Sequence, residues 1–345
     1  MTQKKNKNEI LYLSFNRDKT CLSLGMETGY RIYDLTKKDS LFFYERIFGK
    51  GVGIIEMLDK TNILGLVGGG NEPLEIQTKL NIYDDKEGKY IAYINFKSLI
   101  LNVRLKKDRI LIITEDFLYL IDTINFKQLD MIALGFEKQK HLVFSFTLEP
   151  DVNNLAYNCT NKKENKIIIN FYDKENKKNS KDLNPNYENN NQILCMEFEK
   201  QGKLLAVTVK NYEYLIIYSA YDGIPLCKCN LNNKSVNSLY ISFEELNKFL
   251  CVSLDNGEII IFNIESVNNI NFFNQNKNEI KEKMWSKFYL PEKKTICAFA
   301  PEEIGNDHII CIGTKGNYYL VKYNNHEKEN LAIKVRERYI LKIDN

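Results

Sequence analysis

The chain contains few of the residues that most catalytic and metal sites require. Of its 345 residues only three are histidines, at His141, His308 and His326, and none belongs to a HExxH or CxxH spacing. There is no GxSxG sequence to mark a nucleophilic serine. The eight cysteines include no CxxC pair, and Cys227 and Cys229 would need distant partners to hold a metal. We therefore expect neither an enzyme nor a bound cofactor or metal.

Long apolar runs and a strong net charge are absent as well. No run approaches the roughly 20 residues of a membrane span, and the polar Met1–Glu9 has no apolar segment typical of a secretory signal. Most cysteines lie within apolar runs, as buried thiols of a reducing cytoplasm do. A net charge of +3 gives no indication of a nucleic-acid partner. We expect a cytoplasmic protein with a disordered lead over residues 1–8.

What the chain does contain is a repeated pair of short apolar runs joined at a turn. Phe249–Ile264 shows the pattern best, because Asn256-Gly257 lies between its two runs and a type I′ hairpin turn needs positive φ at both central positions. The same layout recurs four times, at Cys21–Leu35, Ile110–Ile124, Leu205–Ala220 and Ile309–Tyr323.

These hairpins divide the chain into seven units of about 40–55 residues, a spacing typical of four-stranded propeller blades. The units begin near residues 10, 41, 91, 142, 192, 236 and 295. Helical periodicity is nearly absent, so the chain is all-β, and a closed ring would hide the sheet edges. We predict a single, monomeric, seven-bladed WD40-like β-propeller over residues 9–345. We also expect one terminus to complete a blade begun by the other.

The glycine run Gly68–Gly70 allows two interpretations. Three consecutive glycines suggest a phosphate-binding loop, but no helix pattern follows them and no GK[ST] sequence is present. We therefore predict a turn at the end of a strand.

Several segments resemble one known family. Leu13–Leu35 is similar to the opening blade of the PROPPINs, the β-propellers that bind polyphosphoinositides, and Gly51–Pro73 closely resembles their second blade. Further segments resemble the third and last blades, so the resemblance covers nearly the whole chain. It implies a role in autophagy and endosomal trafficking. Family members recognise phosphatidylinositol 3-phosphate and 3,5-bisphosphate on membranes and recruit other proteins there.

The resemblance also implies where lipid headgroups would bind. The family motif (Phe/Leu)-Arg-Arg-Gly directs two arginines to opposite sides of one blade, and each guanidinium meets phosphate oxygens bidentately. Here the motif falls on Cys229–Asn232. Asn230 and Leu231 replace both arginines, and Asn232 replaces the glycine. Lys228 and Lys234 are the cations that remain nearby.

The next blade departs from the family as well. Ser253 matches a family pocket residue, but Glu258 stands in place of threonine and Ile260 in place of histidine. A carboxylate repels phosphate and isoleucine donates no hydrogen bond. Two functions stay open: a phosphoinositide-reading adaptor, peripheral on autophagosomal or endosomal membranes, and a degenerate scaffold that binds only proteins. A third, an unrelated WD-type scaffold, is disfavoured by the Gly51–Pro73 block.

Family members insert a loop of the sixth blade into the membrane, and the matching segment is Glu265–Met284. Ile270, Phe272 and Phe273 would form its apolar tip among flanking lysines, a composition that suits anionic membrane surfaces. The alternative is that the two phenylalanines pack against the propeller. If the loop inserts, replacing both with serine abolishes liposome flotation.

Overall fold

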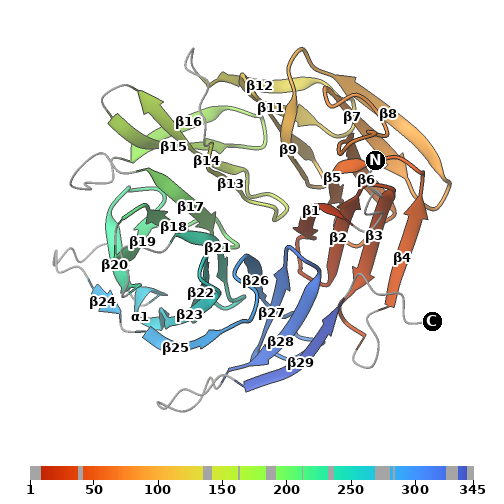
Figure 1. Ribbon diagram of the computed structural model, residues 1–345. Coiled ribbons are helices and arrows are strands. Elements are labelled where there is room, and N and C mark those ends of the chain that lie inside the picture. The colour runs from red at the N-terminus through yellow and green to blue at the C-terminus, as the bar shows by residue number, and fades with distance from the viewer. Residues whose placement is uncertain are drawn as a thin grey trace.

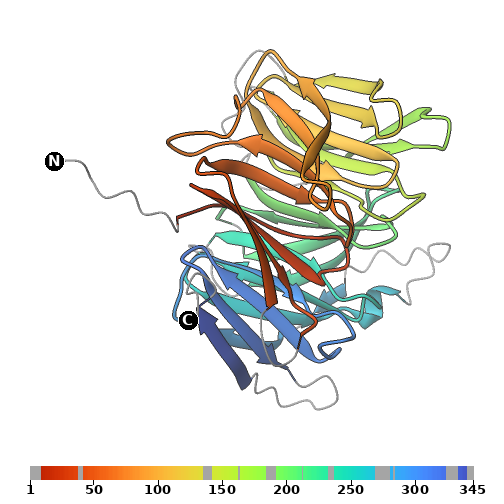
Figure 2. The ribbon, with the colours of Figure 1, turned by 90° about the vertical axis from the view of Figure 1, so that its right-hand side faces the viewer.

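The computed structural model describes residues 9–37, 42–134, 142–161, 164–183, 192–211, 213–231, 237–268, 280–282, 284–323 and 333–339. Six sheets of four strands and one of five are arranged around a common axis, which confirms the predicted all-β, seven-bladed propeller (Figure 1). Figure 2 shows the same ring from its side.

The four strands of each blade follow one another in the chain, beginning with the strand nearest the axis (Figure 1). Blade 1 contains β1 (Ile10–Phe15), β2 (Cys21–Met26), β3 (Gly29–Asp34) and β4 (Phe42–Ile47). Blade 2 contains β5 (Val52–Met57), β6 (Ile63–Gly68), β7 (Lys79–Asp84) and β8 (Lys89–Asn95). Blade 3 contains β9 (Ile100–Leu105), β10 (Arg109–Thr114), β11 (Phe117–Asp122) and β12 (Gln128–Ala133). Blade 4 contains β13 (Phe144–Phe146), β14 (Asn154–Asn161), β15 (Glu164–Tyr172) and β16 (Lys178–Leu183).

The remaining blades have the same order. Blade 5 contains β17 (Ile193–Phe198), β18 (Leu204–Val209), β19 (Tyr214–Ser219) and β20 (Pro225–Asn230). Blade 6 contains β21 (Ser238–Phe243), β22 (Phe249–Leu254), β23 (Glu258–Asn263) and β25 (Met284–Tyr289). Blade 7 contains β26 (Thr295–Phe299), β27 (His308–Gly313), β28 (Asn317–Lys322) and β29 (Ile333–Tyr339). Two short elements lie between β23 and β25, namely α1 (Glu265–Asn268) and β24 (Ile280–Glu282).

Two expectations about the blades are wrong. Blades 1 and 7 each form from four consecutive strands, so neither terminus completes the other's blade. The segments expected to open the second and third units are instead the outer strands β4 and β8 of the preceding blades. An outer strand is half exposed and precedes a connection to the next blade, so its sequence does not reveal which neighbour it joins.

The hydrophobic core lies between blades rather than within them. Each of seven buried apolar clusters combines residues of two neighbouring blades. Between blades 1 and 7 the cluster includes Leu22, Leu24, Ile310 and Ile312, all fully buried. Burying one such side chain contributes about 1.5–3 kcal/mol. This cluster closes the ring in place of a strand shared by the termini.

One turn of blade 1 ties blades that are not neighbours. Arg17 Nε lies 2.7 Å from Asp59 Oδ1 in blade 2, and its Nη1 lies 3.2 Å from Glu149 Oε2 in blade 4. Lys19 Nζ donates to Ser242 Oγ at 2.9 Å and to the Phe243 carbonyl at 3.2 Å, both in blade 6. Because these partners lie in separate blades around the ring, the turn links them across the axis.

The glycine run is a packed turn, in agreement with the prediction. β6 ends at Gly68, and the Leu74 amide donates to the Gly51 carbonyl at 2.8 Å. A Cβ on Gly68 would run into the Glu75 carbonyl, and Gly69 packs against Gly53 with no room for a side chain. The glycines therefore allow backbone to meet backbone.

Candidate functional site

Asn230 and Leu231 point to opposite sides of blade 5, as the family resemblance implies. Asn230 is the register partner of Tyr214, and partners in an antiparallel pair share a face. Tyr214 packs against the apolar cluster between blades 4 and 5. Leu231 belongs to the cluster between blades 5 and 6. The geometry of the paired family positions is therefore present without either arginine.

Leu231 is part of the hydrophobic core. Its side chain is only 4% exposed and shares its cluster with Ile260, which is 1% exposed. Its amide donates to the Glu213 carbonyl at 2.7 Å. Where the family would direct a guanidinium and a histidine toward a phosphate, this chain brings two aliphatic side chains into interblade packing.

Glu258 is neutralised within its own blade. The buried carboxylate accepts a hydrogen bond from the Tyr289 hydroxyl at 3.0 Å, and Lys287 Nζ lies 3.2 Å from the same Oε1 atom. The hydrogen bond from Lys287 to Glu258 and the charge of Glu258 raise the pKa of Lys287. Glu258 and Lys287 therefore neutralise each other. The pair has no net positive charge with which to bind a phosphate.

Ser253 lies on the other side of the blade 6 sheet. It is fully buried and pairs with Ile259, a member of the cluster between blades 6 and 7. Ile260, by contrast, faces blade 5. The structure therefore does not bring Ser253 to the groove that contains Leu231 and Ile260, because successive residues of a strand alternate faces.

The other expected site residues contribute less. Lys228 is partly buried and pairs in register with Ile216, on the blade 4 side. Five expected positions lie outside the described residues: Asn232, Lys234, Ile270, Phe272 and Phe273.

In the described part of the chain, no helix has the length and apolar character that crossing a membrane requires.

The sequence analysis missed two elements, α1 and β24, because it assigned all of Glu265–Met284 to a loop. Within that segment β24 pairs in parallel with β20, aligning Cys227 with Ile280 and Cys229 with Glu282. Blade 5 therefore has a fifth strand along its outer edge. A three-residue strand inside a polar segment has too few alternating residues to be recognised from sequence.

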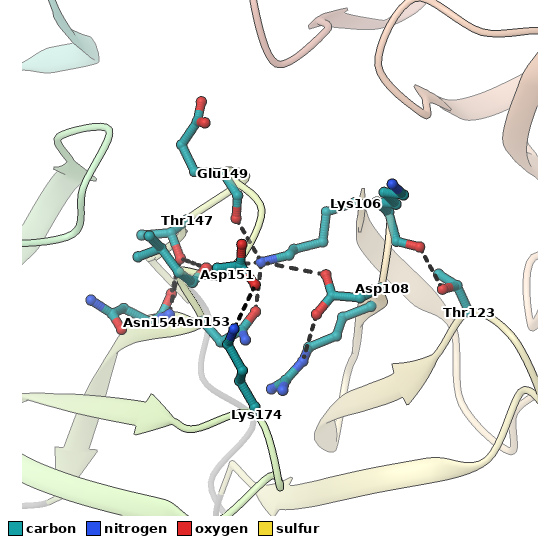
Figure 3. Close-up of polar contacts among 12 residues, drawn as sticks. Lys106, Asp108, Thr123, Thr147, Glu149, Asp151, Asn153, Asn154 and Lys174 are labelled. Carbon is teal, nitrogen blue, oxygen red and sulfur yellow. Dashed lines mark hydrogen bonds and ion pairs between the residues drawn. The ribbon is translucent and has the colours of Figure 1, made fainter.

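Two buried cations, Lys106 and Arg109, donate to oxygens of blade 4, as Figure 3 shows for Lys106. Lys106, 1% exposed, donates to the carbonyls of Glu149 and Val152 at 2.9 and 2.8 Å and to Asn153 Oδ1 at 2.6 Å. Burial lowers the pKa of Lys106 to about 8. Arg109 donates from Nη2 to the Asp173 carbonyl at 3.1 Å. All three ammonium donors of Lys106 are engaged, so it fixes the β13–β14 turn.

A hollow of about 400 Å³ lies beside blades 4 and 5, where the rings of Phe171 and Tyr221 stack with centroids 4.9 Å apart. Its two lysines are already paired, Lys177 with Glu175 and Lys178 with Asp130. The hollow therefore does not replace the missing arginine site.

Within the described residues, no group of three or more His, Cys, Asp or Glu side chains is placed to hold a metal ion, and Cys227 and Cys229 are buried with their sulfurs 3.7 Å apart.

Comparisons of sequence give a consistent family assignment. A family model described as PROPPIN matches residues 10–293. Autophagy-related protein 18 of Yarrowia lipolytica is 24% identical over 281 residues, covering 75% of this chain and 67% of that protein. Autophagy-related protein 18 of Dictyostelium discoideum is 26% identical over 273 residues, covering 77% and 68%. The chain thus spans about two thirds of the length of these relatives, and 62% of the Candida glabrata protein of the same name.

Comparisons of structure agree on the fold. Kluyveromyces lactis Hsv2 with complete loop 6CD superposes with a TM-score of 0.77 at 14% identity, covering 96% of this chain and 99% of that one. KlAtg21, in a complex with the coiled-coil of AgAtg16, superposes with a TM-score of 0.76 at 16% identity and the same coverage. At such low identity the likeness concerns the fold alone.

Proposed function

This chain belongs to the PROPPIN family, and from that premise we propose that it is a non-enzymatic adaptor in autophagy-related membrane trafficking. It recruits other proteins through its propeller surface. In this proposal the chain does not bind a headgroup at the family positions. The two faces of blade 5 that would contribute to the site pack against the neighbouring blades instead.

The observation that carries the proposal is the burial of Leu231 with Ile260 between blades 5 and 6. A phosphoinositide headgroup needs charge-assisted hydrogen bonds, which guanidinium groups supply best. The matching position is apolar and 4% exposed. Glu258 already holds the neighbouring Lys287 at 3.2 Å. A headgroup would therefore lose its hydration here without gaining a cation.

Protein recruitment is supported by the relatives. The curated relatives are autophagy-related proteins, and KlAtg21 is seen with a coiled-coil of AgAtg16. We accordingly propose an autophagy protein as the partner, with a helical coiled-coil as one segment type that the propeller accepts. Peripheral contact with autophagosomal or endosomal membranes then comes from such partners and from the loop that bears Ile270, Phe272 and Phe273.

Liposome co-sedimentation of the full chain tests the proposal. Vesicles of otherwise equal composition, with and without phosphatidylinositol 3-phosphate, should pellet the same fraction of the protein. A PROPPIN that retains the arginine pair serves as the positive control, and the F272S/F273S variant reports the contribution of the loop. Sedimentation of this chain that requires the phosphoinositide would overturn the proposal.

A further inference from the structure

The outer edge of blade 5 differs from those of the other blades. β24 lies in parallel beside β20, with Lys228 aligned to Lys281 and one residue pair on either side (Figure 1). In the described parts of the other six blades, the fourth strand pairs on its inner side only. The chain itself therefore already pairs with part of the outward edge of β20, over Cys227–Cys229.

The edge strand β20 has few charges of its own to discourage pairing. Its residues PLCKCN include one charged side chain, Lys228. The outer strand of blade 4, with residues KNSKDL, carries Lys178, Lys181 and Asp182. Charged residues on an edge strand discourage pairing with another chain, whereas a largely uncharged edge invites it. The outer strands β8, β12 and β25 also carry one charged residue each, so what distinguishes the edge of blade 5 is the strand β24 beside it.

The cover is also easily displaced. β24 contains three residues, and parallel pairing is less stable per residue than antiparallel pairing. A few ladder hydrogen bonds gain little net free energy, while ordering the segment costs conformational entropy. β25 begins two residues after β24 ends, and Met284 packs against the cluster between blades 5 and 6. Blade 6 thus keeps β24 near the edge when the pairing breaks.

We propose that the outer edge of blade 5 is a strand-addition site for an extended peptide segment of a partner protein, with β24 as its internal occupant. The proposal rests on the protein-recruiting function proposed above. β24 shows which ligand fits: an extended, proline-free segment that runs parallel to β20. Cys227 and Cys229 are fully buried, so recognition relies mainly on the backbone.

Disulfide trapping on the full chain tests whether the edge accepts a peptide. The probe is a peptide of residues 277–284 with K281C, presented as a mixed disulfide to protein carrying K228C, and adducts are counted by mass spectrometry. Protein with K228C and K281P, whose own strand cannot pair, should form at least fivefold more adduct than protein with K228C alone. A probe that also carries I280P should stay at the background set by protein lacking K228C. Equal trapping in both proteins, or by both probes, would overturn the proposal.

Hydrogen exchange tests the cover directly. The amides of Cys227–Cys229 should exchange at least tenfold faster in K281P than in the native chain and at the native rate in K281A, while β18 and β19 stay unchanged. If K281P disturbs β18 and β19, I280P takes its place. Unchanged exchange of β20 in the proline variants would contradict the assignment. Neither experiment contains lipid, so their failure is distinguishable from phosphoinositide-dependent sedimentation, which would overturn the proposed function.

Discussion

Leu231 and Ile260 lie in one buried apolar cluster between blades 5 and 6, at positions where the family places an arginine and a histidine. Leu231 continues the side of β20 that carries Cys227 and Cys229, both fully buried. Ile260 comes from β23 of the next blade. This burial is why we propose that the groove which the resemblance assigns to a headgroup is part of the interblade core in this chain.

Returning the family arginine to position 231 should destabilise the protein. L231R buries an unpaired charge among aliphatic side chains, which costs about 3 kcal/mol or more. N230R is the matched control, because the Asn230 side chain is only partly buried on the other side of β20, and we expect it to cost less than about 1 kcal/mol. Urea unfolding measures both. Native stability of L231R would show that the groove still accommodates a cation.

Removing the cross-axis lysine should loosen the ring. Lys19 donates to Ser242 and to the Phe243 carbonyl, and K19M removes both hydrogen bonds from a charged donor at a cost of about 2 kcal/mol. K86M, at an exposed lysine, should change the free energy of unfolding by less than about 0.5 kcal/mol. The two variants are compared by thermal and urea unfolding. Equal stability would mean that interblade packing alone holds blades 1 and 6 together.

The partly buried carboxylate of Glu197 should make stability depend on pH. Burial raises the pKa of Glu197 to about 7, against an ordinary value of 4.5, and Lys19 only partly offsets the effect. The folded state therefore binds a proton that the unfolded state releases, so stability is greatest below pH 4.5 and falls as the pH rises toward 7. E197Q removes this titration.

We accordingly expect the stability of E197Q relative to the native chain to rise by on the order of 2 kcal/mol between pH 5 and pH 8. Urea unfolding at pH 5, 6.5 and 8 measures the difference. E87Q, at an exposed glutamate, should show no such trend. A relative stability of E197Q that is independent of pH would refute the assignment of the titration to this carboxylate.

The glycine turn offers a steric prediction. G68A should cost about 3 kcal/mol, since its Cβ would meet the Glu75 carbonyl and neither backbone can move freely. Gly49 is the control, because a Cβ there meets nothing within 4 Å and only its φ of +72° opposes alanine. We expect G49A to cost about 1 kcal/mol. Similar losses in both variants would mean that the Glu75 backbone moves to make room for the added Cβ.

Much of the fold was predictable from local patterns. The predicted hairpin inside Phe249–Ile264 joins β22 to β23, and the seven-bladed, all-β ring follows the repeats. The expected type I′ turn is wrong, because Gly257 has a φ of 89° but Asn256 does not have positive φ, and the Gly257 amide donates to the Leu254 carbonyl at 3.1 Å. The closure of the ring was not predictable, because outer strands such as β4 and β8 are half exposed and lack a distinctive apolar pattern. The contact of Lys19 with blade 6 joins residues more than two hundred positions apart, and no sequence spacing encodes it.

The candidate site was predictable in its substitutions but not in its geometry. The family resemblance implies that Asn230, Leu231, Glu258 and Ile260 stand at the family's functional positions, and this remains a prediction. Which side of a sheet each residue faces depends on strand register, and this separates Ser253 from Ile260. The pairing of Glu258 with Lys287 depends on the alignment of β23 with β25. Neither relationship can be inferred from residue types alone.

Titration of the full chain with soluble inositol 1,3-bisphosphate, the headgroup without its membrane, tests the central claim most directly. Calorimetry should detect no saturable binding up to millimolar concentration, while a PROPPIN that retains the arginine pair serves as the positive control. Saturable binding of the headgroup to this chain at micromolar concentration would contradict the claim that its family site has become interblade core.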